Sequence, residues 1–152
     1  MKVLAIDTAS SACSAAVATE GVVIAGRSEA MTRGQAEVLM PMVQEVMAAA
    51  KSAYSDLDLV AVTIGPGSFT GLRTGLAAAR GIALAQGIPA VGVTTLEAVA
   101  AAAARNATAS EAALPIVVAL ETRRADLYIQ RFDAVLTPAN TPSHYFSTYT
   151  PI

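Results

Sequence analysis

The chain has 152 residues, of which 54% are hydrophobic and only 14% are charged, and its formal net charge is −2. This apolar content is ample for a folded core and argues against intrinsic disorder. Apart from Arg123-Arg124 there is no basic cluster. This weighs against autonomous nucleic-acid binding, because neutralising phosphates needs a concentrated positive face.

A single cysteine and a single histidine limit the available chemistry. Cys13 alone cannot form an internal disulfide or a cysteine-cluster metal site, and it suits a reducing compartment. His144, in a polar tail, would have to serve any Ser-His-Asp or Cys-His arrangement, so we expect none. The chain opens on a strand pattern, with no charged-then-apolar leader, and no run reaches membrane-spanning length, so we expect a cytoplasmic protein.

Hydrophobic periodicity predicts strands and helices in a mixed order. Thr94 and Glu97 have the spacing of a capping box, and Pro41 should bend the first helix or end its first turns. From Leu136 the chain is rich in Thr, Pro and Ser, and we expect no further helix there. The expected strands are 2–6, 13–19, 22–27, 59–64, 90–93, 115–120 and 126–132, and the expected helices are 34–51, 72–86 and 96–105.

The alanine- and serine-rich stretch 106–113 reads as a domain boundary. We therefore expect one domain over 1–110 and an incomplete second domain over 113–152, made of a strand pair and a polar tail. A strand pair with nothing following to cover it is not a complete domain.

The stretch between the strand 59–64 and the helix 72–86 is rich in glycine. Ser68 or Thr70 is suited to cap the helix, and a strand–glycine turn–helix unit can hold an anion, because free N–H groups and the helix dipole converge there. Leu72 follows Gly71 where a Walker A loop needs lysine, and Thr70 stands where a dinucleotide fingerprint needs glycine. The alternative is a tight connection whose glycines let the helix pack close. The candidate ligand-binding residues of this loop are Gly65, Gly67, Ser68, Thr70 and Arg73.

Asp7 ends the first strand and is followed by the small polar run Thr8-Ala9-Ser10-Ser11. An acidic residue in this position suggests a loop that faces a phosphate or a metal. The other interpretation is an Asx-type turn, in which the carboxylate satisfies backbone N–H groups. The sequence does not decide between them.

The order of elements resembles the actin/sugar kinase/Hsp70 (ASKHA) ATPase superfamily, and within it the motifs resemble the TsaB (YeaZ) family of tRNA threonylcarbamoyladenosine synthesis. The resemblance covers about residues 1–135. It implies an α/β, ribonuclease H-like fold, with a mixed five-stranded sheet, flanking helices and the start of a second similar domain. The matching motifs are Leu4-Ala5-Ile6-Asp7-Thr8 with Cys13-Ser14, Gln35-Ala36-Glu37-Val38-Leu39-Met40-Pro41, Asp56-Leu57-Asp58, Gly65-Pro66-Gly67-Ser68-Phe69-Thr70-Gly71-Leu72-Arg73-Thr74-Gly75, and Ile88-Pro89 with Gly92-Val93.

The chain also departs from the family pattern. Gln35 stands where the family usually has histidine, the turn 121–128 differs, and no match extends beyond Phe132. The catalytic paralogue, TsaD, uses a His-x-x-x-His metal pair on the first helix, and this chain has Gln35 and Leu39 there. Nucleotide-binding relatives have a glycine at the position of Ala9.

The resemblance therefore implies a non-catalytic partner subunit that binds and activates a TsaD-type paralogue. A TsaE-type ATPase is the further partner, and tRNA is met only indirectly. The resemblance implies no catalytic residue, metal or cofactor of the chain's own, and leaves open ATP at an interface of the complex. Two alternatives are an autonomous ASKHA-type ATPase, using Asp7 and the glycine loop, and an M22-like peptidase.

The partner surface implied by the resemblance lies on the first two helices. Gly71, Gly75 and Ala79 form a small-residue stripe at helical spacing on the second helix, which allows close helix approach, and the methionine-rich first helix offers adaptable apolar contacts. In isolation the same surface allows a homodimer. The expected interface residues are Leu39, Met42, Val43, Val46, Met47, Gly71, Leu72, Gly75, Leu76 and Ala79.

Overall fold

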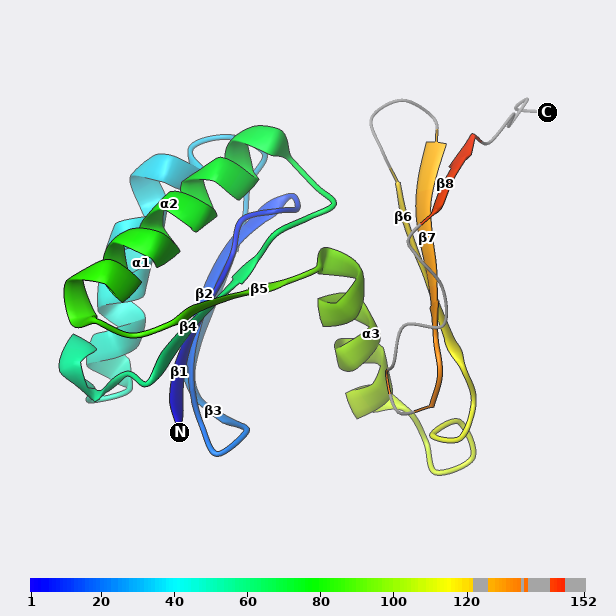
Figure 1. Ribbon diagram of the computed structural model, residues 1–152, viewed down its shortest axis with the longest axis horizontal. Helices are drawn as coiled ribbons and strands as arrows, with labels where there is room; N and C mark the ends of the chain where they lie inside the picture. The colour runs from blue at the N-terminus through cyan, green and yellow to red at the C-terminus, as the bar shows by residue number, and fades with distance from the viewer. Residues whose placement is uncertain (122–125, 135, 137–142, 147–152) are drawn as a thin grey trace. The chain divides into compact units, whose positions relative to one another are not determined.

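The computed structural model describes residues 1–121, 126–134 and 136, and the backbone of 143–146. The chain divides into two compact units, Met1–Val93 and Thr94–Ile152, and each contains a sheet of its own (Figure 1). The polar turn 122–124 and the tail 137–142 lie outside the described residues, as does the side chain of His144.

The first unit is built on a mixed five-stranded sheet of order β3-β2-β1-β4-β5. The first three strands are antiparallel neighbours, whereas β4 runs parallel to β1 and β5 parallel to β4. This arrangement confirms the α/β fold expected for this part of the chain. The strands are β1 (Lys2–Asp7), β2 (Ala12–Thr19), β3 (Val22–Ala30), β4 (Leu59–Thr63) and β5 (Ala90–Val93).

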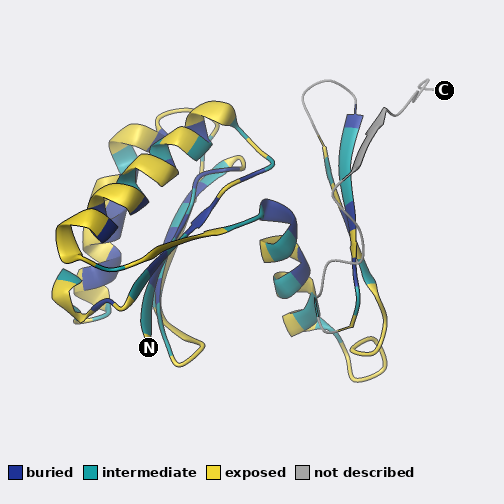
Figure 2. Ribbon diagram, in the orientation of Figure 1, coloured by how far each residue is buried: buried dark blue, intermediate teal, exposed yellow. Residues whose placement is uncertain are grey.

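Two helices, α1 (Gln35–Ala49) and α2 (Phe69–Gln86), cover the same face of this sheet (Figure 1). Alternation along each strand directs every second side chain toward them. The parallel register places Leu4 level with Val60 and Ile6 level with Val62, and all four side chains are buried. Figure 2 shows the buried residues on the inner sides of the helices and along the strands beneath them.

Helix α1 is continuous through Pro41, which the sequence analysis expected to bend it or to end its first turns. Proline removes one intrahelical hydrogen bond. Here Pro41 is exposed, while Leu39 before it and Met42 and Val43 after it are buried against the sheet. The packing of both halves holds the helix together across the missing bond.

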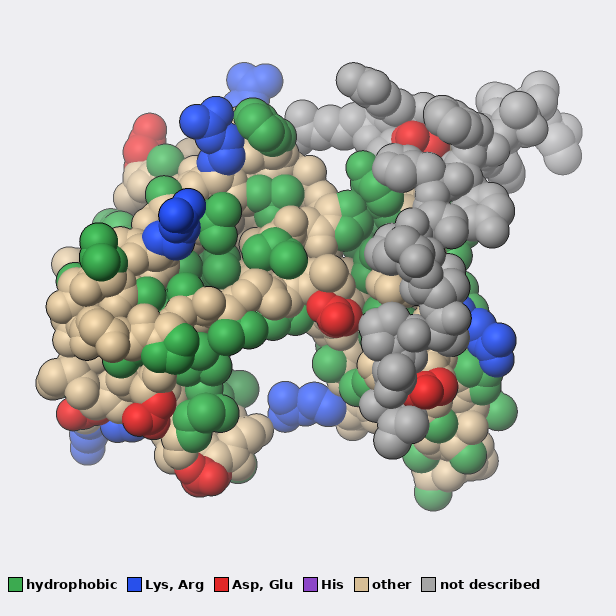
Figure 3. Space-filling view, viewed as in Figure 1, with side chains coloured by type: hydrophobic (Ala, Val, Ile, Leu, Met, Phe, Trp, Pro, Cys, Tyr) green, Lys and Arg blue, Asp and Glu red, His purple; other side chains and the backbone are tan. Residues whose placement is uncertain are grey.

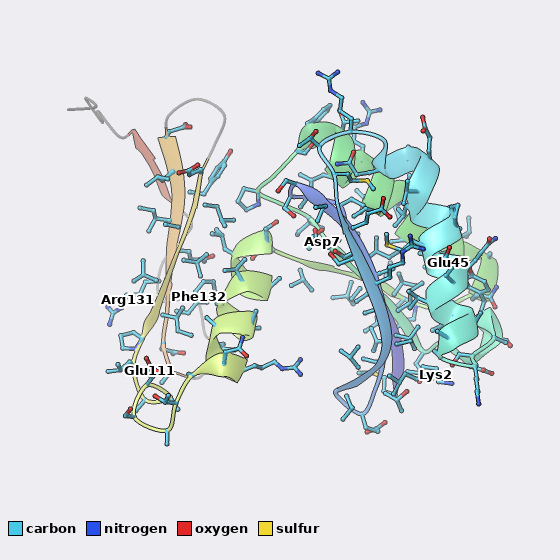
Figure 4. The ribbon with its side chains drawn as sticks, turned by 180° about the vertical axis from the view of Figure 1, so that it is seen from behind. Lys2, Asp7, Glu45, Glu111, Arg131 and Phe132 are labelled. Carbon is cyan, nitrogen blue, oxygen red and sulfur yellow. The ribbon has the colours of Figure 1, made fainter. Side chains whose placement is uncertain are left out.

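The second unit contains α3 (Thr95–Asn106), with β6 (Ile116–Glu121) and β7 (Asp126–Phe132) paired antiparallel. The helix begins at the expected capping box, in which the Glu97 amide donates to Thr94 Oγ1 at 3.1 Å and the Thr94 amide donates to Glu97 Oε2 at 2.7 Å. Phe132 points from β7 toward α3 (Figure 4). Of the described residues in this unit, the buried hydrophobic ones are Leu96, Ala100, Val118 and Phe132.

The second unit differs from the expectation in two respects. Leu96 and Ala100 of α3 pack with the buried residues of β6 and β7, so α3 groups with residues 94–152, whereas the expected domain limits placed it within 1–110. The tail also contributes a third strand, β8 (Ser143–Phe146), which pairs antiparallel with β7. The polar composition of the tail hid this strand, because backbone pairing requires no apolar pattern.

The two units should differ in their resistance to local opening. Among the residues that the structure describes, sixteen buried ones form the core cluster of the first unit, against four in the second. Since local stability follows buried apolar contact, we expect the amides of β6 and β7 to exchange with solvent hydrogen faster than those of β1 and β4. Native-state hydrogen exchange followed by mass spectrometry measures this, and equal protection in the two sheets would contradict it.

Candidate functional site

The glycine loop joins β4 to α2, and its glycine and serine residues serve the connection itself. Gly65 has a φ of +104°, in the left-handed region that favours glycine, and precedes a cis peptide bond to Pro66. Ser68 is the N-cap of α2, and its Oγ accepts from the Gly71 amide at 3.3 Å, which confirms the first of the two expected caps. Thr70 does not cap the helix: it is exposed, and its carbonyl accepts from the Thr74 hydroxyl.

The β1–β2 loop lies against the N-terminal end of α2. The Ser68 amide donates to the Ala9 carbonyl oxygen at 2.7 Å, and the buried Thr8 hydroxyl donates to the Gly71 carbonyl oxygen at 2.7 Å. A Cβ added at Gly67 would lie 2.3 Å from the Ala9 oxygen, and one added at Gly71 would lie 2.0 Å from the Thr8 oxygen. These glycines therefore admit the protein's own backbone, which favours the tight-connection interpretation over an anion cradle.

Asp7 is held by two donors at the end of β1. Its Oδ1 accepts from the Ala9 amide at 2.9 Å and from the Thr63 hydroxyl at 2.7 Å. The bond from the Ala9 amide, two residues after Asp7, is the hydrogen bond that defines an Asx turn. The carboxylate thus links the β1–β2 loop to the end of β4. In the described part of the chain no three His, Cys, Asp or Glu side chains gather closely enough to hold a metal ion.

Cys13 lies on β2 and is fully buried. Burial raises the pKa of its thiol, and the nearby Glu29 and Asp7 carboxylates raise the pKa further. A thiol protonated at neutral pH and shielded from solvent is a poor nucleophile. Cys13 serves the core of the first unit.

Most of the residues expected to meet a partner are buried in the first unit. The five on α1 are at most 3% exposed because they form the stripe that covers the sheet. On α2, Gly71, Gly75 and Ala79 are buried too, and a Cβ at Gly75 would lie 2.4 Å from Thr8 Oγ1. The small-residue stripe therefore packs on the helix's own sheet. Of the ten residues only Leu72, half-buried, and Leu76, 38% exposed, reach the surface.

The opposite face of α2 is exposed and combines large apolar side chains with arginines, and we name it the outer face of α2. Phe69 is 73% exposed and Leu84 is 86% exposed, and the Arg73 guanidinium lies over the Phe69 ring, 5.4 Å from its centroid. Figure 3 shows Lys or Arg side chains beside hydrophobic ones over α2. The outer face of α2 consists of Phe69, Arg73, Leu76, Arg80 and Leu84.

Of this face, only Arg73 and Leu76 are site residues expected from the sequence, Arg73 as a loop residue and Leu76 as an interface residue. The outer-face positions are separated by four, three, four and four residues, which places them on one side of a helix. A helical wheel centred opposite Gly71, Gly75 and Ala79 would have grouped them.

The comparisons with known proteins agree on one family. A family model described as "TsaD: tRNA N6-adenosine threonylcarbamoyltransferase" matches residues 21–140. The TsaB protein of Escherichia coli, named for tRNA threonylcarbamoyladenosine biosynthesis, is 37% identical over 128 residues, which are 84% of this chain and 53% of that protein. The structure of YeaZ from Pseudomonas aeruginosa superposes with a TM-score of 0.85 at 28% identity and covers 99% of this chain and 70% of that one.

The chain belongs to the TsaB (YeaZ) family of the ASKHA superfamily. The TsaB protein of Haemophilus influenzae is also similar, with 30% identity over 86% of this chain and 53% of that protein. The chain thus spans about half the length of the curated TsaB relatives it matches. Among the described residues no helix is both long and apolar enough to cross a membrane.

The close approach of α2 to the β1–β2 loop can be tested with two glycines of one helix. Gly71→Ala places a methyl group into the Thr8 carbonyl and should destabilise the fold by about 1–3 kcal/mol or more. Gly81 has nothing within 4 Å of an added Cβ. Gly81→Ala should therefore stabilise by up to about 1 kcal/mol through helix propensity.

Urea unfolding followed by circular dichroism measures the two free energies of unfolding. If Gly71→Ala were as stable as Gly81→Ala, the backbone contact between Thr8 and α2 would not be a constraint on the fold.

Proposed function

We propose that this chain is a non-catalytic partner subunit in the synthesis of tRNA threonylcarbamoyladenosine. In this role it binds a TsaD-type threonylcarbamoyltransferase through its first two helices and activates it. Family membership supports the pathway, because TsaB relatives carry that name. A TsaE-type ATPase would join the same complex, and the chain would interact with tRNA only indirectly, through the paralogue.

One observation carries the proposal of a binding role: the loop that could hold an anion is filled by the chain itself, while the outer face of α2 is exposed. The Ala9 carbonyl accepts from the Ser68 amide. This amide is one of the donors at the start of α2 for which the helix itself supplies no acceptor. An anion at this point would have to displace the carbonyl. Phe69 and Leu84 meanwhile expose most of their side chains. Large exposed apolar side chains that share one face are typical of binding surfaces.

The buried side chains of the first two helices hold the fold together and do not reach the surface that a partner would contact. Val43 is fully buried, so a charge there would unfold the first unit and report nothing about binding. The large apolar side chains that these two helices expose are those of the outer face of α2, together with Met40 of α1, which is 39% exposed. We assign the contact to these residues.

An autonomous ATPase is the alternative that specific residues favour. Asp7 and the glycine loop lie together at the carboxyl ends of β1 and β4, where sheets of this kind hold ligands. Against it, both Asp7 hydrogen bonds are internal, and Gly67 and Gly71 are packed on backbone. ATP at an interface with the paralogue stays compatible with the partner role.

Assembly with the paralogue tests the proposed function. Leu76→Glu and Leu84→Glu should each weaken binding of the TsaD-type paralogue from the same organism by at least about tenfold, because each places a charge in the apolar part of the interface. Val99→Glu on α3 is the matched control, since Val99 is 40% exposed and Leu76 is 38% exposed. Calorimetric titration gives the affinities, and light scattering gives the stoichiometry.

Nucleotide binding separates the two candidate functions. If the chain is a partner subunit, its melting temperature alone should be unchanged by millimolar MgATP, because a ligand that does not bind the native state cannot stabilise it. Differential scanning fluorimetry measures this, with the chain mixed with its paralogue as the comparison. Stabilisation of the isolated chain by several degrees would favour the ATPase.

A further inference from the structure

A short series of hydrogen bonds runs from the end of β4 to the start of α2 and passes through Asp7. The Thr63 hydroxyl donates to Asp7 Oδ1 at 2.7 Å, and the same oxygen accepts from the Ala9 amide at 2.9 Å. The Ala9 carbonyl oxygen in turn accepts from the Ser68 amide at 2.7 Å, and Ser68 is the N-cap of α2. Asp7 therefore connects the ends of two strands to the residue at which α2 begins.

The register of the sheet brings Asp7 and Thr63 together. Strands β1 and β4 are parallel, with Ile6 level with Val62, and Asp7 and Thr63 are the next residues of these two strands. Thr63 is only 7% exposed. A buried hydroxyl without a hydrogen-bond partner costs free energy, so the bond to Asp7 satisfies a group that the sheet has already removed from water.

The two hydrogen bonds need an acceptor oxygen at Asp7 and not its negative charge. Both of them use the same atom, Oδ1. The side-chain amide of asparagine offers an acceptor oxygen of the same kind, and asparagine forms the same Asx turn. A carboxylate that faced a metal ion or a phosphate would instead act through its charge. Asparagine at this position therefore distinguishes the two roles.

We propose that Asp7 and Thr63 are positioning residues, which act on partner binding through the β1–β2 loop and the first turn of α2. This inference rests on the proposed function and adds residues that control it from outside the contact surface. Phe69, which belongs to the outer face of α2, directly follows Ser68. A loop released from Asp7 leaves this turn free to open locally, and the partner must then order the turn when it binds, which lowers the affinity.

Two pairs of variants test the inference in the full chain with its TsaD-type paralogue. Asp7→Ala and Thr63→Val each remove the hydrogen bond between the two side chains and should each weaken binding by about tenfold. Asp7→Asn and Thr63→Ser keep the acceptor and the hydroxyl, so each should bind within about twofold of the wild type. Calorimetric titration gives the four affinities.

A second measurement separates positioning from a general loss of stability. Hydrogen exchange of the Ser68 amide, followed by NMR in the chain alone, should be faster in Asp7→Ala and Thr63→Val than in the wild type, because the start of α2 opens locally. The control is Val17→Ala. Val17 is fully buried on β2, so this variant destabilises the first unit but keeps the hydrogen bonds of Asp7. It should leave both the exchange of Ser68 and the affinity unchanged.

The outcomes separate this inference from the proposed function. A wild-type chain that does not bind the paralogue overturns both. If the wild type binds and Leu84→Glu weakens binding, while Asp7→Ala and Thr63→Val bind like the wild type, only the positioning role is overturned.

Three further results would overturn the positioning role alone. If Asp7→Asn binds as weakly as Asp7→Ala, the charge of Asp7 is what binding needs. If Val17→Ala binds as weakly as Asp7→Ala, lost stability accounts for the effect. If Asp7→Ala does not fold, the two variants at position 63 decide, and equal affinities for Thr63→Val and Thr63→Ser contradict the inference.

Discussion

The contact between the β1–β2 loop and the start of α2 is the constraint on which the first unit depends. Two backbone carbonyls, of Thr8 and Ala9, lie where side chains at positions 71 and 67 would otherwise stand. This close contact sets the distance between α2 and the sheet, and it lets Gly75 and Ala79 pack closely on β1 and β4. It also uses donors at the helix start that a bound anion would need. One packing arrangement thus shapes the fold and removes an option for function.

Much of this unit could be predicted from the sequence. The strand patterns, the Ser68 cap and the resemblance in the glycine string were enough for the five-stranded sheet. The role of the glycines could not be settled, because a glycine that admits a phosphate and one that admits a carbonyl leave the same sequence pattern. Asp7 was equally ambiguous until its bonds to Ala9 and Thr63 were located. Residues 122–125 and 137–142 lie outside the described residues, so the polar turn and most of the tail stay predictions.

The candidate interface was harder to predict than the fold. An apolar stripe on a helix does not say whether it faces its own sheet or a partner, and the stripes of α1 and α2 both face the sheet. The informative residues are the large apolar ones outside those stripes, Phe69 and Leu84. Only their exposure in the structure distinguishes them from residues of the core. The helix pair expected to bind a partner keeps that role in our proposal, but on its opposite face.

We propose that the chain acts through the outer face of α2 and not through its glycine loop. Hydroxyl-radical footprinting with mass spectrometry, on the chain alone and with its TsaD-type paralogue, tests this at single side chains. We predict that Phe69 and Leu84 become strongly protected in the complex, while Val22 and Val117, which are 63% and 62% exposed on β3 and β6, are modified as before. A complex in which Phe69 and Leu84 react as in the free chain would contradict the account.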